Sequence, residues 1–257
     1  MTETRPLALI TGASSGIGYE LARQFVLAGY DLVVNAEDER LEAAAQDLRE
    51  TGAQVRADLR TGEGRFRLLD ALDGLTVDVA ALNAGVGQGG AFVDTELADD
   101  QEVIDLNVTA TVRLAKPLLR GMVTRGAGRL AFTSSVAAMM PGSFQPVYNA
   151  SKAFVQSFAQ ALAEEVKDTG VTVTSFMPGP TDTDFFDRAD MADDTRIGTM
   201  EKDDPAQVAE QAFRAIVKGE QKAVTGSWKT KAQGLAGKLL PDGVKGAAHR
   251  RMAEPDR

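Results

Sequence analysis

The side chains best suited to chemistry in this sequence are a tyrosine and a lysine four residues apart, Tyr148 and Lys152, with Ser135 thirteen residues before the tyrosine. Residues four apart on a helix share a face, so the lysine ammonium can lie beside the phenol. A nearby cation lowers the pKa of a tyrosine from its usual value of about 10. A phenol tuned in this way can act as a general acid or base near neutral pH. An ordinary amphipathic helix carries such a pair equally well, so the prediction needs support from elsewhere in the chain.

A glycine-rich turn near the N-terminus supplies that support. The apolar run at residues 7–10 predicts a buried strand, and a helical pattern of apolar residues occupies 16–28. The turn between them has the spacing G-x-x-x-G-x-G. Such a turn lets the backbone approach a pyrophosphate and directs free N–H groups and the positive end of the helix dipole towards it. The turn residues expected to bind are Gly12, Ser14, Ser15, Gly16, Ile17 and Gly18.

The ordered set of motifs resembles that of the short-chain dehydrogenases/reductases, over residues 5 to about 225. The matching features are the turn at 11–18, Asp58-Leu59, Asn83-Ala84-Gly85, Asn107, Ser134-Ser135, Tyr148 with Lys152, and Pro178-Gly179-Pro180-Thr181. The resemblance implies a Rossmann-like α/β fold with a seven-stranded parallel sheet. It also implies that a nicotinamide cofactor takes part in hydride transfer between a carbonyl and an alcohol.

The resemblance implies a role for each catalytic candidate. Tyr148 would donate or accept the proton at the substrate oxygen, and Lys152 would lower the tyrosine pKa and reach the nicotinamide ribose. Ser135 would donate to the substrate carbonyl, and its neighbour Ser134 should face the other side of the strand. Asn107 would hold a kink in its helix and a water that relays protons to Lys152.

Further stretches would contact the cofactor, again by resemblance. Asn83-Ala84-Gly85 would carry the chain past the adenine ribose. Asp58, followed by Leu59, would accept a hydrogen bond from the adenine amine. Pro178-Gly179 and Thr181 would lie at the nicotinamide.

The choice between NAD and NADP depends on the segment after the second strand. Family members that use NAD often carry an aspartate at the position of Ala36, and those that use NADP often carry an arginine at the position of Glu37. This chain has neither, but residues 35–39 are acidic and would repel a 2′-phosphate. A carboxylate there can instead accept hydrogen bonds from the ribose hydroxyls. We therefore predict NAD, with NADP left open by Arg40 and Arg60.

The elements that must hold these residues alternate between strand and helix. This alternation predicts a doubly wound parallel sheet with helices on both faces. Strands are expected near 7–10, 31–35, 54–57, 79–83, 129–134, 171–177 and 222–225. Helices are expected near 16–28, 38–50, 62–73, 98–124, 147–168 and 205–218.

Residues 1–225 are therefore predicted to form a single domain for cofactor binding and catalysis, followed by a C-terminal helical extension at 226–257. Residues 182–204 lack clean periodicity and follow the expected nicotinamide site, which favours a mobile lid over the substrate. Apolar side chains at 139–144 and 185–191 suggest an apolar substrate pocket.

Composition restricts the class of protein. With 257 residues, of which 44% are hydrophobic, the chain fits a single large α/β domain, and a net charge of −9 argues against a nucleic-acid partner. No apolar run approaches the ~20 residues that span a bilayer, and we expect no signal peptide. The absence of cysteine excludes disulfides and thiolate metal sites and favours the cytoplasm. No metal site of any kind is predicted.

The expected partners are a small-molecule substrate and further copies of this chain. The helices at 98–124 and 147–168 carry apolar residues on more than one face, and the family pairs these helices across a two-fold axis. We therefore predict a homodimer or a homotetramer, because closed symmetric oligomers are the common case.

Two other functions fit parts of the sequence. Residues 12–16 match the G-x-S-x-G pattern of serine hydrolases, but the only histidine that could serve as the base is His249, near the C-terminus. The second alternative is a nucleotide-binding sensor without turnover. Such proteins commonly lose the tyrosine or the lysine, and both are present here.

Overall fold

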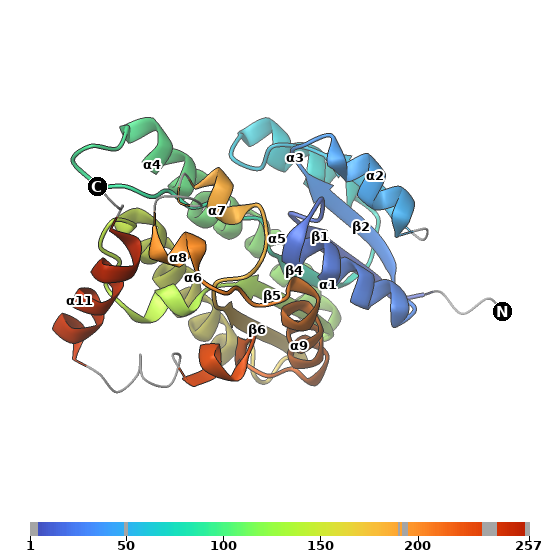
Figure 1. The fold of residues 1–257 in the computed structure, drawn as a ribbon. Coiled ribbons are helices and arrows are strands. Elements are labelled where there is room, and N and C mark those ends of the chain that lie inside the picture. Colours follow the sequence, from blue (N-terminus) through green and yellow to red (C-terminus); the bar gives the residue numbers. More distant parts are fainter. Residues whose placement is uncertain (1–4, 49–50, 190, 192–194, 233–240, 255–257) are drawn as a thin grey trace.

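A computed structural model gives the fold and describes residues 5–48, 51–189, 191, 195–232 and 241–254. A seven-stranded parallel sheet stands at its centre, in the order β3-β2-β1-β4-β5-β6-β7 (Figure 1). The strands are β1 (Leu7–Thr11), β2 (Asp31–Ala36), β3 (Thr51–Arg56), β4 (Val77–Leu82), β5 (Gly128–Thr133), β6 (Val171–Pro178) and β7 (Lys222–Thr225). The predicted fold class is confirmed, and each expected strand is present to within a few residues.

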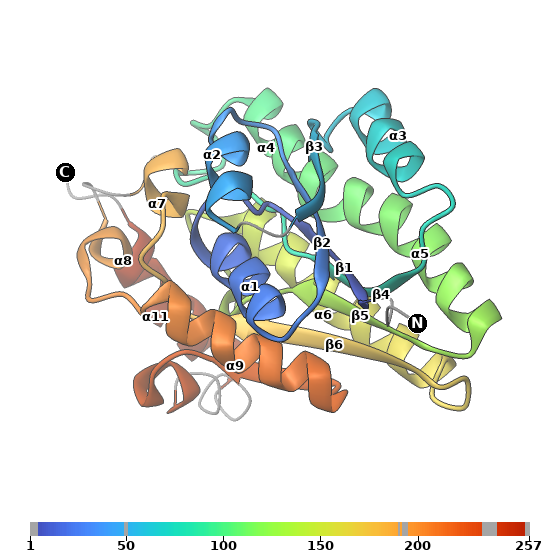
Figure 2. The ribbon, with the colours of Figure 1, turned by 90° about the vertical axis from the view of Figure 1, so that its right-hand side faces the viewer.

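Helices cover both faces of the sheet (Figure 2). One face carries α1 (Gly16–Leu27), α2 (Arg40–Asp47) and α9 (Pro205–Lys218). The other face carries α3 (Gly62–Ala71), α5 (Thr111–Arg125) and α6 (Pro146–Glu165). Each face has its own apolar core, because the strands are buried on both sides. Phe25 and Ile216 lie in the first core, and Leu114 and Phe132 lie in the second.

The start of α9 follows the sequence signals closely. Pro205 occupies the first helical position, where its missing N–H costs nothing. The Asp204 side chain accepts a hydrogen bond from the Ala206 N–H at 2.9 Å. Gly219 ends the helix with a φ of +71°, which glycine adopts without strain. The predicted helix at 205–218 is confirmed at both ends.

The long helix predicted over 98–124 is interrupted by a wider turn. α4 (Leu97–Ile104) leads into the π-helical stretch η1 (Asp105–Ala110), which continues as α5. Asn107 lies in η1, where its Nδ2 donates to the Val86 carbonyl and to the Ser151 hydroxyl, both at 2.9 Å. Its Oδ1 accepts from the Val86 N–H at 3.0 Å. The prediction of one regular helix was therefore wrong here, and such π-helical insertions are frequent at functional sites.

The segment predicted as an irregular lid, 182–204, contains two short helices, α7 (Phe185–Arg188) and α8 (Arg196–Thr199). Residues 190 and 192–194 of that segment lie outside the described residues. From the C-terminal region, α11 (Asp242–Ala253) packs beside α8 (Figure 1). Within the part of the chain that the structure describes, no helix combines the length and the apolar character needed to cross a bilayer.

Candidate active site

A long cleft runs across the carboxyl ends of the strands, where the strand order reverses between β1 and β4. Open α/β sheets bind their ligands at this position. The lining includes every predicted site residue except Asn107, which stands behind the cleft. These lining residues are Gly12, Ser14, Ser15, Gly16, Ile17, Gly18, Glu37, Asp58, Leu59, Asn83, Ala84, Gly85, Ser135, Tyr148, Lys152, Pro178, Gly179 and Thr181.

The glycine-rich turn brings the N-terminus of α1 to the cleft. Gly12 and Gly16 have φ angles of +67° and +57°, a conformation that side chains disfavour. A Cβ on Gly12 would lie 2.9 Å from the Ala84 Cα, so a larger residue would displace the backbone. Ser15 precedes the helix, but its side chain makes no capping hydrogen bond. The first N–H groups of α1 and the helix dipole are therefore available to an anion.

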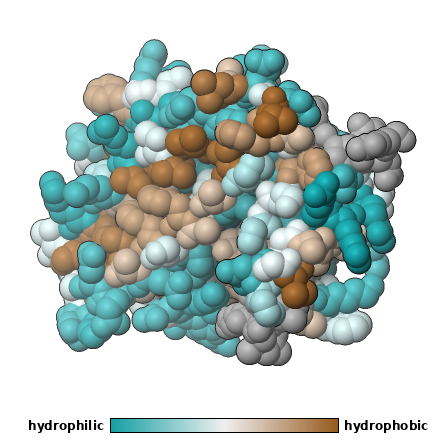
Figure 3. Space-filling view, turned by 90° about the vertical axis from the view of Figure 1, so that its left-hand side faces the viewer, coloured by the Kyte–Doolittle hydropathy of each residue, from teal (hydrophilic) through white to brown (hydrophobic). Residues whose placement is uncertain are grey.

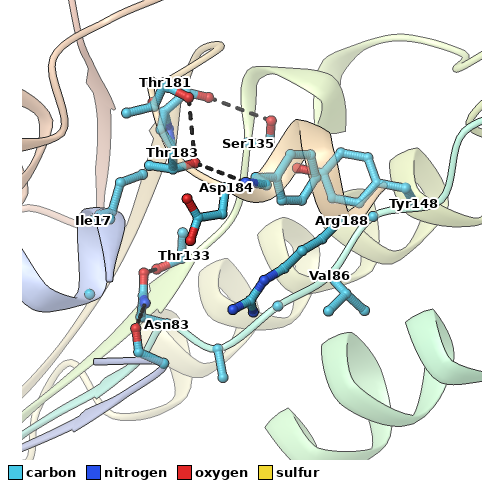
Figure 4. Close-up of a pocket in the computed structure, with 18 of the residues that line it drawn as sticks. Ile17, Asn83, Val86, Thr133, Ser135, Tyr148, Thr181, Thr183, Asp184 and Arg188 are labelled. Carbon is cyan, nitrogen blue, oxygen red and sulfur yellow. Dashed lines mark hydrogen bonds between the residues drawn. The ribbon is translucent and has the colours of Figure 1, made fainter. Parts of the chain in front are cut away.

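Asn83 ties three strands together beneath the cleft. Its backbone N–H donates to the Thr11 hydroxyl at 2.9 Å, and its Nδ2 donates to the Thr11 carbonyl at 3.0 Å. The Thr133 hydroxyl donates to the Asn83 Oδ1 at 2.9 Å (Figure 4). Because Thr11 and Thr133 end β1 and β5, this network fixes the spacing of the strand ends that carry the site.

Tyr148 and Ser135 meet in the cleft, one from the start of α6 and the other from just after β5. The Ser135 hydroxyl lies close enough to the Tyr148 phenol to favour its ionised form, and it accepts a hydrogen bond from the Ala137 N–H at 3.1 Å. The Ser134 hydroxyl instead donates to the Lys152 carbonyl at 3.0 Å. The two serines therefore have different roles, as the alternation along an extended chain predicts.

Lys152 is buried one helical turn after Tyr148. Its Nζ lies 5.7 Å from the centroid of the Tyr148 ring and donates to the Thr133 carbonyl at 3.0 Å. Gly85 passes close by, so a Cβ there would lie 3.1 Å from both the Lys152 Nζ and the Asn107 Oδ1. The absence of a side chain at Gly85 thus leaves room for both the Lys152 ammonium and the Asn107 amide oxygen.

Burial dominates the protonation of this pair. It raises the pKa of Tyr148 to about 12, against the opposing effect of the Ser135 hydroxyl. It also lowers the pKa of Lys152 to about 8. The expected lowering of the tyrosine pKa by Lys152 does not hold in this geometry, because the phenol is removed from water and the lysine bonds to Thr133. Tyr148 is therefore neutral near pH 7 and has a proton to donate.

β6 ends beside the catalytic pair. The Ser135 hydroxyl lies 3.5 Å from the Pro178 carbonyl. Thr181 is buried and donates from its hydroxyl to the Gly179 carbonyl at 2.9 Å. A backbone bridge joins Thr181 to Asp203, which fixes both ends of the segment that contains α7 and α8.

Acidic side chains at the opposite end of the cleft are paired with an arginine. Arg60 contacts the Asp58 carboxylate at 3.0 Å, the Glu102 carboxylate at 2.6 Å and also Glu37. These three partners raise the pKa of the Arg60 guanidinium, although burial opposes them. A guanidinium that already meets three carboxylates has little capacity for a phosphate.

Two ion pairs tie α7 across the cleft to the link between β2 and α2. Arg188 contacts Asp38 at 3.1 Å, and Asp184 pairs with Arg40. Asp38 also accepts a hydrogen bond from the Ser14 hydroxyl at 3.0 Å. Asp184 and Arg188 lie between Asn83 and Tyr148 in the cleft (Figure 4). Sequence reasoning missed the Arg188–Asp38 pair, because its members stand 150 residues apart.

Comparison with known proteins agrees with this geometry. The model of the short chain dehydrogenase family matches residues 6–194. The chain belongs to the short-chain dehydrogenase family. It is an NAD(P)-dependent oxidoreductase that interconverts carbonyl and alcohol groups.

Several relatives resemble this dehydrogenase over most of their length. Dehydrogenase/reductase SDR family member 7B of Bos taurus is 33% identical over 235 residues, which cover 85% of this chain and 72% of the relative. A short-chain dehydrogenase from Sphingobium yanoikuyae, solved with NADPH, has 30% identity and a TM-score of 0.79, covering 91% of this chain and 93% of its own. The bulky-bulky ketone specific alcohol dehydrogenase from Comamonas testosteroni has 29% identity and a TM-score of 0.76, with the same coverage of 91% and 93%.

The alternative functions find no support in the dehydrogenase. The Ser14 hydroxyl bonds to Asp38, and the His249 ring nitrogens face Ser143 and Asn149, so the hydrolase pattern lacks a base beside its serine. A sensor without turnover is likewise not favoured, because both Tyr148 and Lys152 stand in the cleft. Among the residues given a position, no group of three or more metal-binding side chains comes together.

The predicted apolar pocket of the dehydrogenase is present in part. Met140, Phe185 and Phe186 line the cleft, and the Phe185 ring lies 5.2 Å from that of Tyr148. Met139, Pro141, Phe144 and Met191 were also candidates and are not among the lining residues. Lining side chains that sequence reasoning missed include Gln145, Arg188, His249 and Met252.

Proposed function

We propose that this dehydrogenase interconverts a ketone and a secondary alcohol, with Tyr148 exchanging the proton at the substrate oxygen. The Ser135 and Tyr148 hydroxyls, which face one another inside the cleft, carry the proposal. Two hydroxyls that converge in this way can both donate to one carbonyl oxygen. Donors fixed where negative charge develops are among the largest contributors to catalysis.

The residues present fit a nicotinamide cofactor. The uncapped N-terminus of α1 and the positive φ angles at Gly12 and Gly16 suit a pyrophosphate, as described above. When bound, the cofactor supplies or accepts the hydride. Lys152 would bind the ribose beside it, and Thr181 would lie at the carboxamide.

Side chains of the protein transfer the proton to and from the substrate oxygen. During reduction, Tyr148 donates its phenol proton to the carbonyl oxygen, and Ser135 holds that oxygen in place. The phenolate that remains is stabilised by the Lys152 ammonium, which lies one helical turn away. Asn107 acts through Lys152, because its bonds to Val86 and Ser151 fix the turn that packs against the lysine. During oxidation, the same phenolate accepts the proton of the alcohol.

Replacement of Tyr148 by phenylalanine tests this assignment. The variant keeps the ring and its contact with Phe185, so cofactor binding measured by calorimetry should be unchanged. Turnover should fall by ~10² or more, the typical contribution of a general acid or base. Tyr30→Phe is the matched control, since Tyr30 packs on Phe25 away from the cleft. Near-normal turnover in Tyr148→Phe would show that the proton comes from another group.

We further propose NAD as the preferred cofactor. Glu37, Asp38 and Asp58 line the end of the cleft. Arg60 is already engaged by Glu37, Asp58 and Glu102, and the arginines at Asp38 are paired with carboxylates. A 2′-phosphate would meet like charge there, whereas ribose hydroxyls can donate to a carboxylate. The relative from Sphingobium yanoikuyae was solved with NADPH and one from Burkholderia phymatum with NAD, so both cofactors occur in similar structures.

The cofactor preference can be measured with one charge reversal and its control. Glu37→Arg should raise kcat/KM with NADP relative to NAD by at least about tenfold, because a bidentate guanidinium suits a phosphate. Glu39→Arg makes the same charge change two residues away, at a side chain that is 84% exposed and outside the lining. A wild-type enzyme that already favours NADP would refute the assignment.

The substrate we propose is an apolar ketone or its alcohol. Met140, Phe185 and Phe186 surround the position next to Tyr148, and the relative from Comamonas testosteroni is specific for ketones with two bulky groups. A screen of ketones, sugars and polyols with each cofactor, followed at the nicotinamide absorbance band, would test this. Turnover restricted to sugars or polyols would contradict an apolar substrate.

We also propose that residues 182–204 act as a lid over substrate and nicotinamide. Phe185 contacts Tyr148, and two exposed ion pairs join α7 to the other side of the cleft. Such pairs are worth little, so the segment can open. Hydrogen exchange at residues 185–188 should slow when cofactor and substrate bind. Exchange that is equally slow in the free protein would indicate a fixed loop.

A homodimer is the proposed assembly. An apolar groove lies between α4, η1 and α6, and its exposed members include Phe92, Ile104 and Phe154. An apolar band crosses the face of the molecule on the side of α4 and α11 (Figure 3). A patch of this kind typically marks an interface. Light scattering at micromolar concentration should give at least twice the mass of the 27.3 kDa chain, and Phe154→Glu should lower it.

A further inference from the structure

The C-terminal helix α11 lies outside the segment that matches the family model, which ends at residue 194. It nevertheless reaches the cleft. Its side chains His249 and Met252 are part of the lining, together with Met140, Gln145 and Tyr148. The substrate end of the cleft is therefore completed by residues that the shared family segment does not contain.

The His249 side chain holds α11 against the segment before and at the start of α6, which carries the catalytic pair. The ring is 2% exposed, and its Nδ1 lies 3.1 Å from the Ser143 carbonyl, which can only accept. Nδ1 therefore bears the proton, and Nε2 accepts from the Asn149 Nδ2 at 3.4 Å. Burial lowers the pKa of His249, although the bond to Ser143 opposes this, so the ring is neutral near pH 7.

Asn149 connects His249 to residues that form the wall of the cleft. It follows Tyr148 in α6, and its Nδ2 also lies 3.1 Å from the Ala137 carbonyl and 3.3 Å from the Met140 carbonyl. Both Ala137 and Met140 line the cleft. One imidazole thus joins α11, the segment after β5 and the start of α6.

α11 also packs against the proposed lid. Ala253 is 1% exposed and belongs to an apolar cluster with Phe186, Ala189 and Met191. Phe185 packs against the same cluster on one side and against the Tyr148 ring on the other. Phe186 and Met252 line the same cleft as Tyr148, so a substrate group that extends past Tyr148 can contact them.

We propose that α11 is the end wall of the substrate pocket, that His249 is the positioning residue that holds it there, and that Met252 sets the largest group a ketone can carry on that side. The inference rests on the proposed function for its substrate class, an apolar ketone. Met252 suits an apolar group of this kind, because a thioether makes favourable contacts with aromatic rings.

Substitutions at Met252 test the size limit. The measured quantity is kcat/KM for benzophenone, with two phenyl groups, divided by that for acetophenone, with one phenyl and one methyl. Met252→Ala should raise this ratio about tenfold, and Met252→Trp should lower it by a similar factor, since pocket contacts of this size discriminate by about 10–200-fold. Arg251→Ala is the control, at an exposed neighbour on the same helix that is not among the lining residues.

Two variants of His249 separate positioning from mere support of the fold. His249→Leu loses both hydrogen bonds and should raise KM for both ketones by about tenfold, while kcat changes by less than about twofold. His249→Asn keeps a donor towards the Ser143 carbonyl and should restore most of the KM. A loss of kcat alone, or no rescue by asparagine, would overturn the positioning role.

Binding of benzanilide, a two-ring amide that cannot be reduced in this way, gives a readout independent of turnover. With the nicotinamide cofactor present, calorimetry should show tighter binding to Met252→Ala than to Met252→Trp, by about tenfold or more. If the wild type reduces neither ketone with either cofactor, the proposed function fails while this measurement still decides the role of α11. Equal affinities in both Met252 variants and the Arg251→Ala control would overturn the inference.

Discussion

Lys152 should make the stability of this protein depend on pH in a way that one substitution removes. Its side chain is 5% exposed, and burial lowers its pKa from 10.5 to about 8. Below about pH 8 the lysine is charged in both the folded and the unfolded chain, and the folded state bears the cost of a buried ammonium. Above that pH the folded chain loses the proton first, so stability rises until the unfolded chain also titrates near 10.5.

The size of this effect follows from the pKa of the lysine in the folded and in the unfolded chain. A tenfold change in the acid dissociation constant corresponds to about 1.4 kcal/mol, so the fall from 10.5 to about 8 corresponds to roughly 3 kcal/mol. Of this, about 2 kcal/mol should be gained between about pH 6.5 and about pH 9.5. The contribution is therefore present at high pH and is lost as the pH falls through the folded-state value near 8.

Urea denaturation of the wild type and of Lys152→Met, over that pH range, measures the effect. Subtracting the free energy of unfolding of one protein from that of the other at each pH cancels the contributions of the other titrating groups. Tyr148 interferes little, because its pKa of about 12 in the folded chain and its ordinary value of 10.0 both lie above the range. The exposed Lys116→Met is the control and should give a flat difference. A difference for Lys152→Met that is flat to within about 0.5 kcal/mol, or that falls with pH, would refute the reasoning.

Three further outcomes are expected. Asn107→Ala removes the partner of both the Val86 N–H and the Val86 carbonyl and should cost about 2–4 kcal/mol in urea denaturation, so a loss below about 1 kcal/mol would contradict the bracing role. Phe25→Ala empties a fully buried site beside Phe213 and should cost about 3–5 kcal/mol in the same assay, unless the core collapses around it. Ketone reduction should slow and alcohol oxidation should quicken as pH rises, because Tyr148 donates a proton in one direction and accepts it in the other. Stopped-flow rates with the same pH trend in both directions would rule this out.

Much of the fold could be predicted because its signals are local. Buried parallel strands appear as short apolar runs, and the start of α9 is marked by Asp204 and Pro205. The π-helical stretch around Asn107 could not be predicted, because it is stabilised by contacts with Val86 and Ser151 rather than by apolar spacing.

The candidate site likewise contains residues that could be predicted from the sequence and residues that could not. Residues in contiguous motifs, such as the turn at 11–18, could be placed in the cleft from the sequence. His249 could not, because a lone histidine beyond the family segment carries no local sign of the pocket it reaches. Whether the pKa of Tyr148 rises or falls also depends on burial, which spacing along a helix does not reveal.

The two ion pairs of α7 have a consequence for how the cofactor enters. A dinucleotide that passes between α7 and the β2–α2 link has to part Arg188 from Asp38 and Asp184 from Arg40. Their side chains are between 25% and 48% exposed, and exposed pairs contribute about 0.2–1 kcal/mol each. Together they contribute about 1 kcal/mol to the closed arrangement, so losing both pairs should raise the ratio of open to closed molecules about fivefold. Salt screens such pairs, so ionic strength sets the open population through residues that never touch the reacting atoms.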